Sequence, residues 1–186
     1  MGKLFVISGA SGVGKSTVLK AVTAARNDLL FSVSVTTRQP REGEIDGVHY
    51  DFITREKFQE MVEKDAFAEY DIHHAACYGT PRKQLEEKQE RGHVILDIDP
   101  NGAFQVRERC PGATLIFITP PSYEELERRL RGRADGMPEE KILGRLDRAK
   151  WEMDQSAKYD YVVVNDDVDR CAKEILNIIS EKEHEE

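Results

Sequence analysis

The chain has 186 residues, of which 39% are hydrophobic and 33% charged, and its formal net charge is −8. This length suits a single α/β domain with its own core and room for small inserted subdomains. The negative balance argues against a broad surface for nucleic acid or anionic membranes, and no apolar run approaches the roughly 18–20 residues that span a bilayer.

Apolar runs and helical spacings alternate along most of the chain, which is typical of a parallel sheet with helices on both faces. The runs predict strands over residues 3–8, 31–36, 93–99, 113–118 and 159–165. The spacings predict helices over residues 15–26, 81–91, 101–109, 122–131, 138–157 and 167–181. Residues 37–80 break this rhythm, and their short strand-like pieces and one helix, near 54–64, predict a small inserted subdomain. Residues 131–137, rich in glycine and arginine, predict a mobile flap between two helices.

The cysteines and the start of the chain indicate the compartment. Cys77, Cys110 and Cys171 lie far apart, without a zinc spacing or a disulfide framework, which favours a reducing cytosol. The first predicted strand begins so close to Met1 that it leaves no room for a signal peptide. We therefore expect a cytoplasmic protein with no nucleic-acid or membrane partner.

The stretch between the first strand and the first helix fits the phosphate-loop pattern G-x-x-x-x-G-K-[ST]. Its residues are Gly9, Ala10, Ser11, Gly12, Val13, Gly14, Lys15, Ser16 and Thr17. Such a loop turns successive backbone N–H groups toward one point at the positive end of a helix dipole. Lys15 would add a mobile positive charge for the β- and γ-phosphates, and the Ser16 hydroxyl could ligate Mg²⁺. The alternative is a glycine-rich turn with an exposed lysine, but the flanking strand and helix favour a phosphate loop.

A second apolar run, over residues 94–98, carries the carboxylates Asp97 and Asp99 at its end. Alternation along a strand that includes residue 99 would place both on one face, and ligands of open parallel sheets bind at the carboxyl ends of strands. Buried carboxylates are costly unless they are paired, hydrated or facing a cation. A Mg²⁺ shell, reached directly or through water, would meet that need. An ordinary strand end with solvated aspartates is the alternative.

Further motifs, taken together with the phosphate loop, resemble one family. In chain order they are Ser34-Val-Thr-Thr-Arg38-Gln-Pro-Arg41-Glu-Gly43, Asp46-Gly47-Val-His-Tyr50-Asp-Phe52, the turn Tyr78-Gly79-Thr80-Pro81, the Asp97–Asp99 segment, Pro120-Pro121-Ser122 and, near the end, Asn165-Asp166-Asp167. This set resembles guanylate kinase, a nucleoside monophosphate kinase that phosphorylates GMP, over nearly the whole chain. The resemblance implies a P-loop NTPase-type parallel sheet flanked by helices, with an inserted mixed α+β GMP-binding subdomain and a helical lid. The implied parts of this single domain are a core (1–33, 84–121 and 158–186), a GMP-binding subdomain (34–83) and a lid (122–157).

The resemblance also implies the reaction, in which Mg·ATP and GMP give ADP and GDP, and the residues on the GMP side. The GMP phosphate would be held by Ser34, Arg38, Arg41, Tyr50 and Tyr78, beside Gly79. Glu69 and Thr80 would read the guanine, whose N1–H and N2 amino donors suit one carboxylate, whereas N1 of adenine is an acceptor. Asp97 and Asp99 would assist the base or the metal, and their roles stay undivided.

The ATP side is implied in the same way. The phosphate loop would bind the ATP phosphates, Arg133 and Arg145 match lid arginines that reach them, and Asn165 matches a residue beside the adenine. The implied catalytic residues are Lys15, Arg38, Arg133 and Arg145. Because the attacking phosphate oxygen is already ionised, we expect no general base, and catalysis by alignment and charge neutralisation. For Arg128 and Arg129, a functional role and a place on a charged outer face both stay open.

The chain departs from the family pattern at residues 100–102, at the lid loop 134–138 and at residues 73–77, but none of these changes removes a phosphate ligand. Two other classes stay open. A guanylate-kinase-like interaction module without catalysis usually lacks an intact phosphate loop. A kinase of a sugar phosphate should lack the guanine-reading set. The resemblance leaves the oligomeric state open, monomer or homo-oligomer, and leaves dGMP open as a second acceptor.

Overall fold

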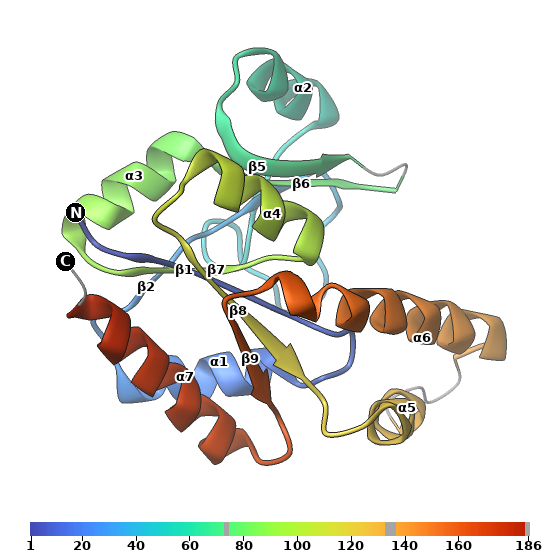
Figure 1. Ribbon diagram of the computed structural model, residues 1–186. Helices are drawn as coiled ribbons and strands as arrows, with labels where there is room; N and C mark the ends of the chain where they lie inside the picture. Colours follow the sequence, from blue (N-terminus) through green and yellow to red (C-terminus); the bar gives the residue numbers. More distant parts are fainter. Residues whose placement is uncertain (73–74, 133–136, 185–186) are drawn as a thin grey trace. The chain divides into compact units, whose positions relative to one another are not determined.

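The computed structural model describes residues 1–72, 75–132 and 137–184 of the chain. The strands are β1 (Leu4–Gly9), β2 (Leu30–Phe31), β3 (Val35–Thr36), β4 (Asp51–Phe52), β5 (Phe67–Ile72), β6 (Cys77–Pro81), β7 (Val94–Asp97), β8 (Thr114–Thr119) and β9 (Tyr161–Val164). The helices are α1 (Lys15–Ala25), α2 (Arg55–Glu63), α3 (Arg82–Arg91), α4 (Pro100–Arg109), α5 (Tyr123–Gly132), α6 (Glu139–Asp154) and α7 (Val168–Glu183), with a short 3₁₀ helix η1 (Ser156–Lys158) (Figure 1). The predicted alternation of strands and helices is confirmed.

Over the described residues the strands form two sheets. The five-stranded sheet has the order β2-β7-β1-β8-β9, and the four-stranded sheet has the order β4-β3-β6-β5. β8 pairs in parallel with both β1 and β9, and β2 pairs in parallel with β7. In the smaller sheet, β3 pairs in parallel with β4 and antiparallel with β6. The predicted parallel sheet and the mixed character of the insert are therefore confirmed.

Packing divides the chain into two compact units. Unit 1 comprises Met1–Leu4 and Asp28–Ala113, and unit 2 comprises Phe5–Asn27 and Thr114–Glu186. This division follows packing alone and leaves the expected core, GMP-binding subdomain and lid as a prediction. No helix in the described part of the chain is both long and apolar enough to cross a membrane.

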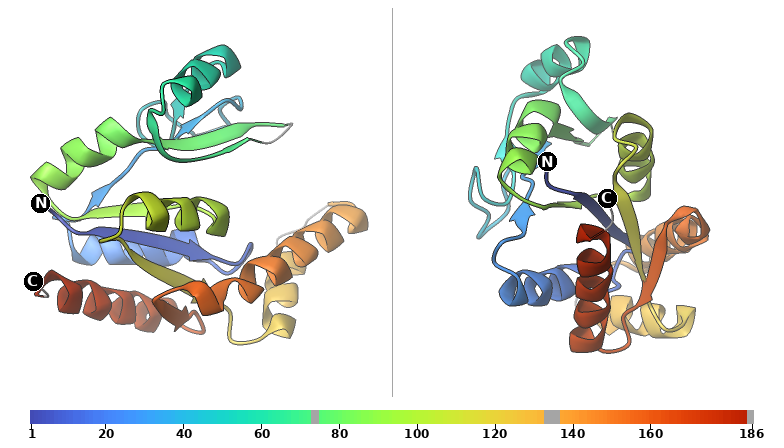
Figure 2. Two further views of the ribbon diagram at one scale, coloured as in Figure 1. Left: turned by 45° about the horizontal axis from the view of Figure 1, so that its top comes forward. Right: turned by 60° about the vertical axis from the view of Figure 1, so that its left-hand side comes forward.

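Unit 2 is built around buried parallel strands. Residues 115–118 of β8 are fully buried, which explains their unbroken apolar run, because a central parallel strand is covered on both faces. The helices α1 and α7 lie side by side in every view (Figures 1 and 2). Each buries an apolar stripe at helical spacing, with Val18 and Val22 in α1 and Ile175 and Ile179 in α7. This packing fixes the start of α1, where the phosphate-loop sequence lies.

The insert, which belongs to unit 1, has a core of its own. Phe58 of α2 and Phe67 of β5 are buried with their ring centroids 4.7 Å apart. Val35 and Cys77 complete this buried cluster. Thr54 caps the N-terminus of α2 with its side chain. The insert is thus a packed α+β element rather than a simple crossover between strands.

Two predicted strands are interrupted, each for a local reason. The run 31–36 is divided between β2 and β3, which lie in different sheets, because the chain leaves one sheet for the other at this point. The run 93–99 stops at Asp97, since Asp99 caps α4 and Pro100 takes the first helical position. The Oδ1 atom of Asp99 accepts the N–H of Gly102 at 3.0 Å. Asp97 and Asp99 therefore do not share a strand face, and that prediction was wrong.

Candidate functional site

The phosphate-loop sequence of unit 2 forms a turn that requires glycine at two places. Gly12 has a φ angle of 87° and Gly14 of 96°, both in the left-handed region. A Cβ on Gly12 would also lie 2.5 Å from Cδ2 of Leu130. The N–H of Val13 donates to the carbonyl of Ala10 at 2.9 Å, and α1 begins directly after the turn. No side-chain hydrogen bond caps α1 among the described residues, and the N-terminus of a helix is in general suited to an anion.

Side chains from α5 and from the segment after β9 hold this loop by one carbonyl. The carbonyl of Val13 accepts the Nδ2 of Asn165 at 2.7 Å and the Nη1 of Arg129 at 3.1 Å. Arg129 also donates to the carbonyl of Asn165 at 3.0 Å and to Glu125 at 2.7 Å. Arg128, in contrast, is exposed and pairs with Glu125 on the outer face of α5. The two arginines therefore differ: Arg129 anchors the loop, whereas Arg128 lies on a charged surface.

In unit 1, the insert surrounds a buried carboxyl group. Glu69 of β5 is 4% exposed, and the Oγ1 of Thr80 donates to its Oε1 at 2.5 Å. The hydroxyl of Ser34 lies 3.3 Å from the hydroxyl of Thr80. Burial, together with the charges of Asp99 and Asp71, raises the pKa of Glu69 to about 7, despite the opposing hydrogen bond from Thr80. The structure thus brings Glu69, Thr80 and Ser34 together around a carboxyl group that titrates near neutral pH.

A second cluster in unit 1 is centred on Arg38. Its Nη1 and Nη2 atoms donate to the two carboxylate oxygens of Glu44 at 2.6 and 2.7 Å. Its Cζ lies 5.0 Å from the ring centroid of Tyr50, whose ring is 6.0 Å from that of Tyr78. Hydrogen bonding to Arg38 lowers the pKa of Glu44 to about 2, and the pKa of Arg38 is raised in turn. Arg41 gives its backbone N–H to Glu44 at 2.8 Å, and its side chain is exposed.

Close packing explains two glycines near these clusters. A Cβ on Gly102, in the first turn of α4, would lie 2.6 Å from Oε2 of Glu69. Gln105 holds α4 to β5 by accepting the N–H of Tyr70 at 3.1 Å and donating to its carbonyl at 2.8 Å. A Cβ on Gly79, a predicted site residue, would lie 2.9 Å from an aromatic ring of β5. The start of α4 therefore packs directly against the buried carboxyl group.

The remaining predicted residues are less enclosed. Ser16 and Thr17 are exposed in the first turn of α1, Asp97 is exposed at the end of β7, and Arg145 is exposed on α6. Arg133 and most of the predicted flap lie outside the described residues. Within the described ranges, no group of three or more His, Cys, Asp or Glu side chains could hold a metal ion.

Three residues that the sequence analysis did not single out contact the predicted ones. Glu44 pairs with Arg38, Gln105 holds the strand that carries Glu69, and Glu152 of α6 accepts the N–H of Ser11 at 2.7 Å. For Glu44, the neighbouring arginines of the motif gave a signal. For the other two no local pattern did, since their partners lie 35 and 141 residues away.

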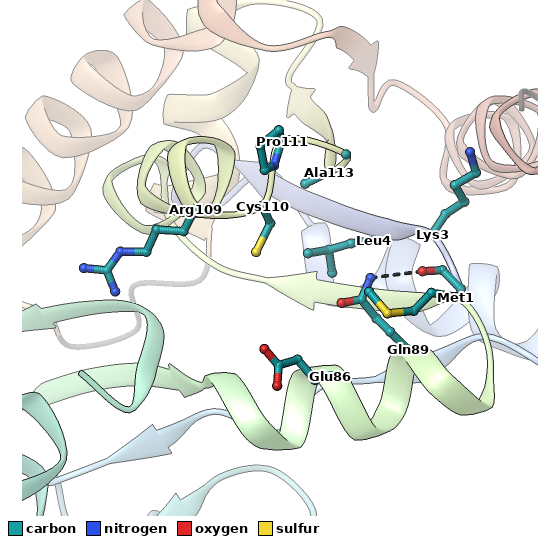
Figure 3. A pocket seen from close by; sticks show the side chains of 11 residues that line it. Met1, Lys3, Leu4, Glu86, Gln89, Arg109, Cys110, Pro111 and Ala113 are labelled. Atoms are coloured by element: carbon teal, nitrogen blue, oxygen red, sulfur yellow. Dashed lines mark hydrogen bonds between the residues drawn. The ribbon is translucent and has the colours of Figure 1, made fainter. Parts of the chain in front are cut away.

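A cavity of about 430 Å³ lies elsewhere in unit 1 (Figure 3). Its lining comes from the start of the chain, from α3 and from the end of α4 and the turn after it, and comprises Met1, Gly2, Lys3, Leu4, Glu86, Gln89, Arg109, Cys110, Pro111, Gly112 and Ala113. The Nε2 of Gln89, which is labelled in Figure 3, donates to the carbonyl of Gly2 at 3.0 Å. None of the predicted site residues lines this cavity, so its volume does not mark the candidate site.

Comparison with known proteins gives one consistent result. A family model described as guanylate kinase matches residues 1–182. The chain is 47% identical over 180 residues to a guanylate kinase of Thermus thermophilus, covering 96% of this chain and 81% of that protein. It is 44% identical over 176 residues to a guanylate kinase of Prochlorococcus marinus, covering 94% of each. The crystal structure of guanylate kinase from Anaplasma phagocytophilum matches with a TM-score of 0.80 at 34% identity, covering 99% of this chain and 87% of that one. A gluconokinase from Sinorhizobium meliloti, at 18% identity and a TM-score of 0.52, shares the fold alone.

Proposed function

The chain belongs to the guanylate kinase family, and we propose that it transfers the γ-phosphoryl group of ATP to GMP, giving ADP and GDP. The observation that supports GMP as acceptor is the buried carboxyl of Glu69 with its partner Thr80, in a chain that also carries a phosphate loop. The phosphate loop is not expected in an interaction module without catalysis. A buried carboxyl group suited to guanine is not expected in a kinase of a sugar phosphate.

On the donor side, we propose the phosphate loop, residues 9–17, as the ATP site. Its N–H groups and the positive end of α1 would hold the phosphates, and Lys15 would neutralise the charge that develops on the transferred group. Asn165, bonded to the loop, would lie beside the adenine. Arg133 and Arg145 would reach the ATP phosphates from the lid.

The residues present fit a magnesium ion bound together with ATP. Mg²⁺ prefers hard oxygen ligands, keeps several waters and binds mainly through substrate phosphates, so it needs no cluster of protein carboxylates. The exposed hydroxyl of Ser16 is such a ligand, and Asp97 or Asp99 would act through water. Asp97 is exposed at the end of β7 and Asp99 caps α4, and the roles of the two stay undivided. When bound, the ion would neutralise phosphate charge.

On the acceptor side, we propose that Arg38 exchanges Glu44 for the phosphate of GMP. Both partners present two oxygens to the guanidinium, so the bidentate geometry carries over. The other phosphate ligands would be Arg41, Ser34, Tyr50 and Tyr78, beside Gly79. Glu69 and Thr80 would bind the guanine, with the carboxylate accepting from N1–H and the N2 amino group.

The chemistry needs no general base, because the attacking oxygen of GMP is ionised at neutral pH. We propose catalysis by alignment of the two phosphates and by neutralisation from Lys15, Arg38, Arg133 and Arg145. The GMP-binding subdomain (34–83) and the lid (122–157) would close on the core and exclude water, which otherwise would hydrolyse ATP.

Two further points concern a second acceptor and the compartment in which the reaction takes place. The proposed GMP contacts go to phosphate and base, and dGMP stays open as a second acceptor. All three cysteines are free thiols, which suits a reducing compartment, and we propose the cytoplasm as the place of action.

A coupled assay of ADP release, with GMP, AMP, CMP and UMP as separate acceptors, tests this function. We expect GMP to be preferred over AMP by at least about a hundredfold in kcat/KM, because a site built on hydrogen bonds rejects a base that leaves them unmade. Absence of ADP release with every nucleotide would support the interaction module. A preference for another acceptor would assign a different kinase.

A further inference from the structure

Glu152, near the C-terminal end of α6, is a buried carboxylate that the proposed mechanism does not use. It is 7% exposed. Its Oε2 accepts the backbone N–H of Ser11 at 2.7 Å, and its Oε1 accepts the Nε of Arg148 at 3.0 Å. A buried carboxylate is tolerated where it is hydrogen-bonded and paired with a cation, and both conditions hold here.

The place of this carboxylate is unexpected for an anion. Ser11 belongs to the loop that would bind the phosphates of ATP, and a fixed negative charge opposes the binding of another anion nearby. Arg148 offsets part of that charge, and its guanidinium also lies 4.6 Å from the ring centroid of Trp151. A carboxylate with a donor on each oxygen at this position points to a geometric role.

The bond fixes the first half of the loop. Glu152 holds the N–H of Ser11, and two residues later the carbonyl of Val13 is held by the two side chains described above. Between these anchors lies Gly12, in the left-handed region at a φ of 87°. Because each fixed peptide group constrains the next, the N–H groups that follow Gly14 are oriented before a ligand arrives, which lowers the entropic cost of binding.

The same helix carries one of the predicted lid arginines. Arg145 and Glu152 are seven residues apart in α6, which is about two turns, so both lie on one face of the helix. The helix therefore links the anchor of the loop to a residue expected to reach the ATP phosphates.

We infer that Glu152 is a positioning residue for the phosphate loop: by accepting the N–H of Ser11 it holds the loop in its anion-binding form and ties it to α6. The inference rests on the proposed function, since it takes this loop to be the ATP site.

Two variants of the same side chain separate the hydrogen bond from the charge. Glu152→Asp keeps the charge but is too short to reach Ser11, whereas Glu152→Gln keeps an oxygen acceptor at the right length. Measured by calorimetric titration with ADP, Kd should rise about tenfold to a hundredfold in Glu152→Asp. It should stay within about threefold of wild type in Glu152→Gln, because the amide oxygen replaces the carboxylate as acceptor. KM for ATP should likewise rise in Glu152→Asp and stay close to that of wild type in Glu152→Gln. KM for GMP should stay unchanged in both variants.

The same shortening at an exposed position of α6, Glu140→Asp, is the matched control and should bind ADP as wild type does. An ADP affinity unaffected in Glu152→Asp would overturn the inference, and so would a loss in Glu152→Gln alone, which would assign the effect to charge. Failure of the wild-type chain to bind ADP would instead reject the proposed function.

Amide hydrogen exchange in the wild-type protein tests the contact even where Glu152→Asp fails to fold. The amide of Ser11, although it lies in a loop, should exchange at least about tenfold more slowly than in an unstructured peptide, since exchange requires the bond to Glu152 to open. Exchange at the peptide rate would contradict the inference.

Discussion

At the scale of single residues, the free protein and the proposed complex with GMP favour different protonation states of Glu69. Its burial raises the pKa of the carboxyl to about 7, so the free protein favours the neutral form more than an exposed glutamate would. Guanine, which presents two donors, favours the ionised form. The residue is therefore less stable as a carboxylate in the free protein than in the proposed complex, and two predictions follow from this difference.

The first prediction concerns the pH dependence of catalysis. Because GMP would bind the carboxylate, a proton must leave Glu69 before binding at pH values below its pKa of about 7. We expect kcat/KM for GMP to fall about tenfold per pH unit below that value and to level off above it. Profiles between about pH 6 and 8.5 for wild type and Glu69→Gln check this, since the phosphate of GMP titrates alike in both. A wild-type profile parallel to that of the variant would contradict the assignment.

The second prediction concerns stability. The pKa of Glu69 is raised from 4.5 to about 7 on folding, so its stabilising effect is complete below pH 4.5 and is lost as the pH rises through 7. Glu69→Gln should therefore stabilise the ligand-free protein by about 1–3 kcal/mol at pH 8 and by nothing near pH 4. Thermal unfolding at both pH values measures this.

The control is Glu60→Gln in α2, where hydrogen bonds from Lys64 and Lys57 hold the pKa of an exposed carboxylate down at about 2. Glu60→Gln should leave the midpoint temperature of thermal unfolding at pH 8 unchanged or lower it. If the midpoint temperature of thermal unfolding of Glu69→Gln at pH 8 lies below that of wild type, burial does not destabilise the ionised carboxyl.

At the scale of elements, α4 frames the buried carboxyl group. A Cβ on Gly102 would lie 2.6 Å from Oε2 of Glu69, so alanine there must displace either the carboxylate or the helix. We expect Gly102→Ala to raise KM for GMP at least about tenfold and to leave KM for ATP within about twofold. Steady-state kinetics with each substrate varied in turn measures both.

Gly144→Ala in α6 is the matched control, because that glycine has open space around its Cβ position. There alanine should stabilise the helix by up to about 1 kcal/mol and leave KM for GMP unchanged. Equal GMP kinetics in both variants would separate Gly102 from the guanine site.

A strand or helix could be predicted from the sequence where one local signal was present without a competing one. The strands predicted at residues 3–8 and 113–118 match β1 and β8 to within one residue at each end, because a strand covered on both faces gives an unbroken apolar run. The strand at 93–99 was extended too far, since the apolar run conceals a competing signal. Asp99 followed by Pro100 is a typical helix start, and the cap prevails over the strand.

Residues of the candidate site could be predicted where a short sequence motif determines the local backbone geometry. They could not be predicted where contacts between residues far apart in the chain create the site. The glycines of the phosphate loop could be selected from their pattern, whereas Glu69 and Thr80, which the structure joins by a hydrogen bond, were selected through the family resemblance. Glu152 could not, because its partner Ser11 lies 141 residues away and an isolated glutamate on a helix is usually solvated. Asp97 and Asp99 were paired by strand alternation, which the cap at Asp99 removes.

At the scale of the whole molecule, the proposed functions lie in different units of the chain. The phosphate loop belongs to unit 2, whereas Glu69, Thr80 and Arg38 belong to unit 1. A net charge of −8 also means that two anionic substrates must be held by local cations rather than by the overall field. Neither unit alone supplies both sets of groups, so the central claim concerns the coupled reaction of the intact chain.

The ratio of kcat/KM for GMP to that for AMP, measured for wild type, Glu69→Gln and Asp71→Asn, tests this claim most directly. The account predicts a strong preference of the wild type for GMP. Glu69→Gln should reduce that preference by about 2–4 kcal/mol of transition-state binding, because its amide presents a donor to guanine. Asp71→Asn, the same change two residues along β5, should retain most of the preference. An unchanged ratio in Glu69→Gln with a collapse in Asp71→Asn would contradict the residue assignment, and a wild type without preference for GMP would contradict the function itself.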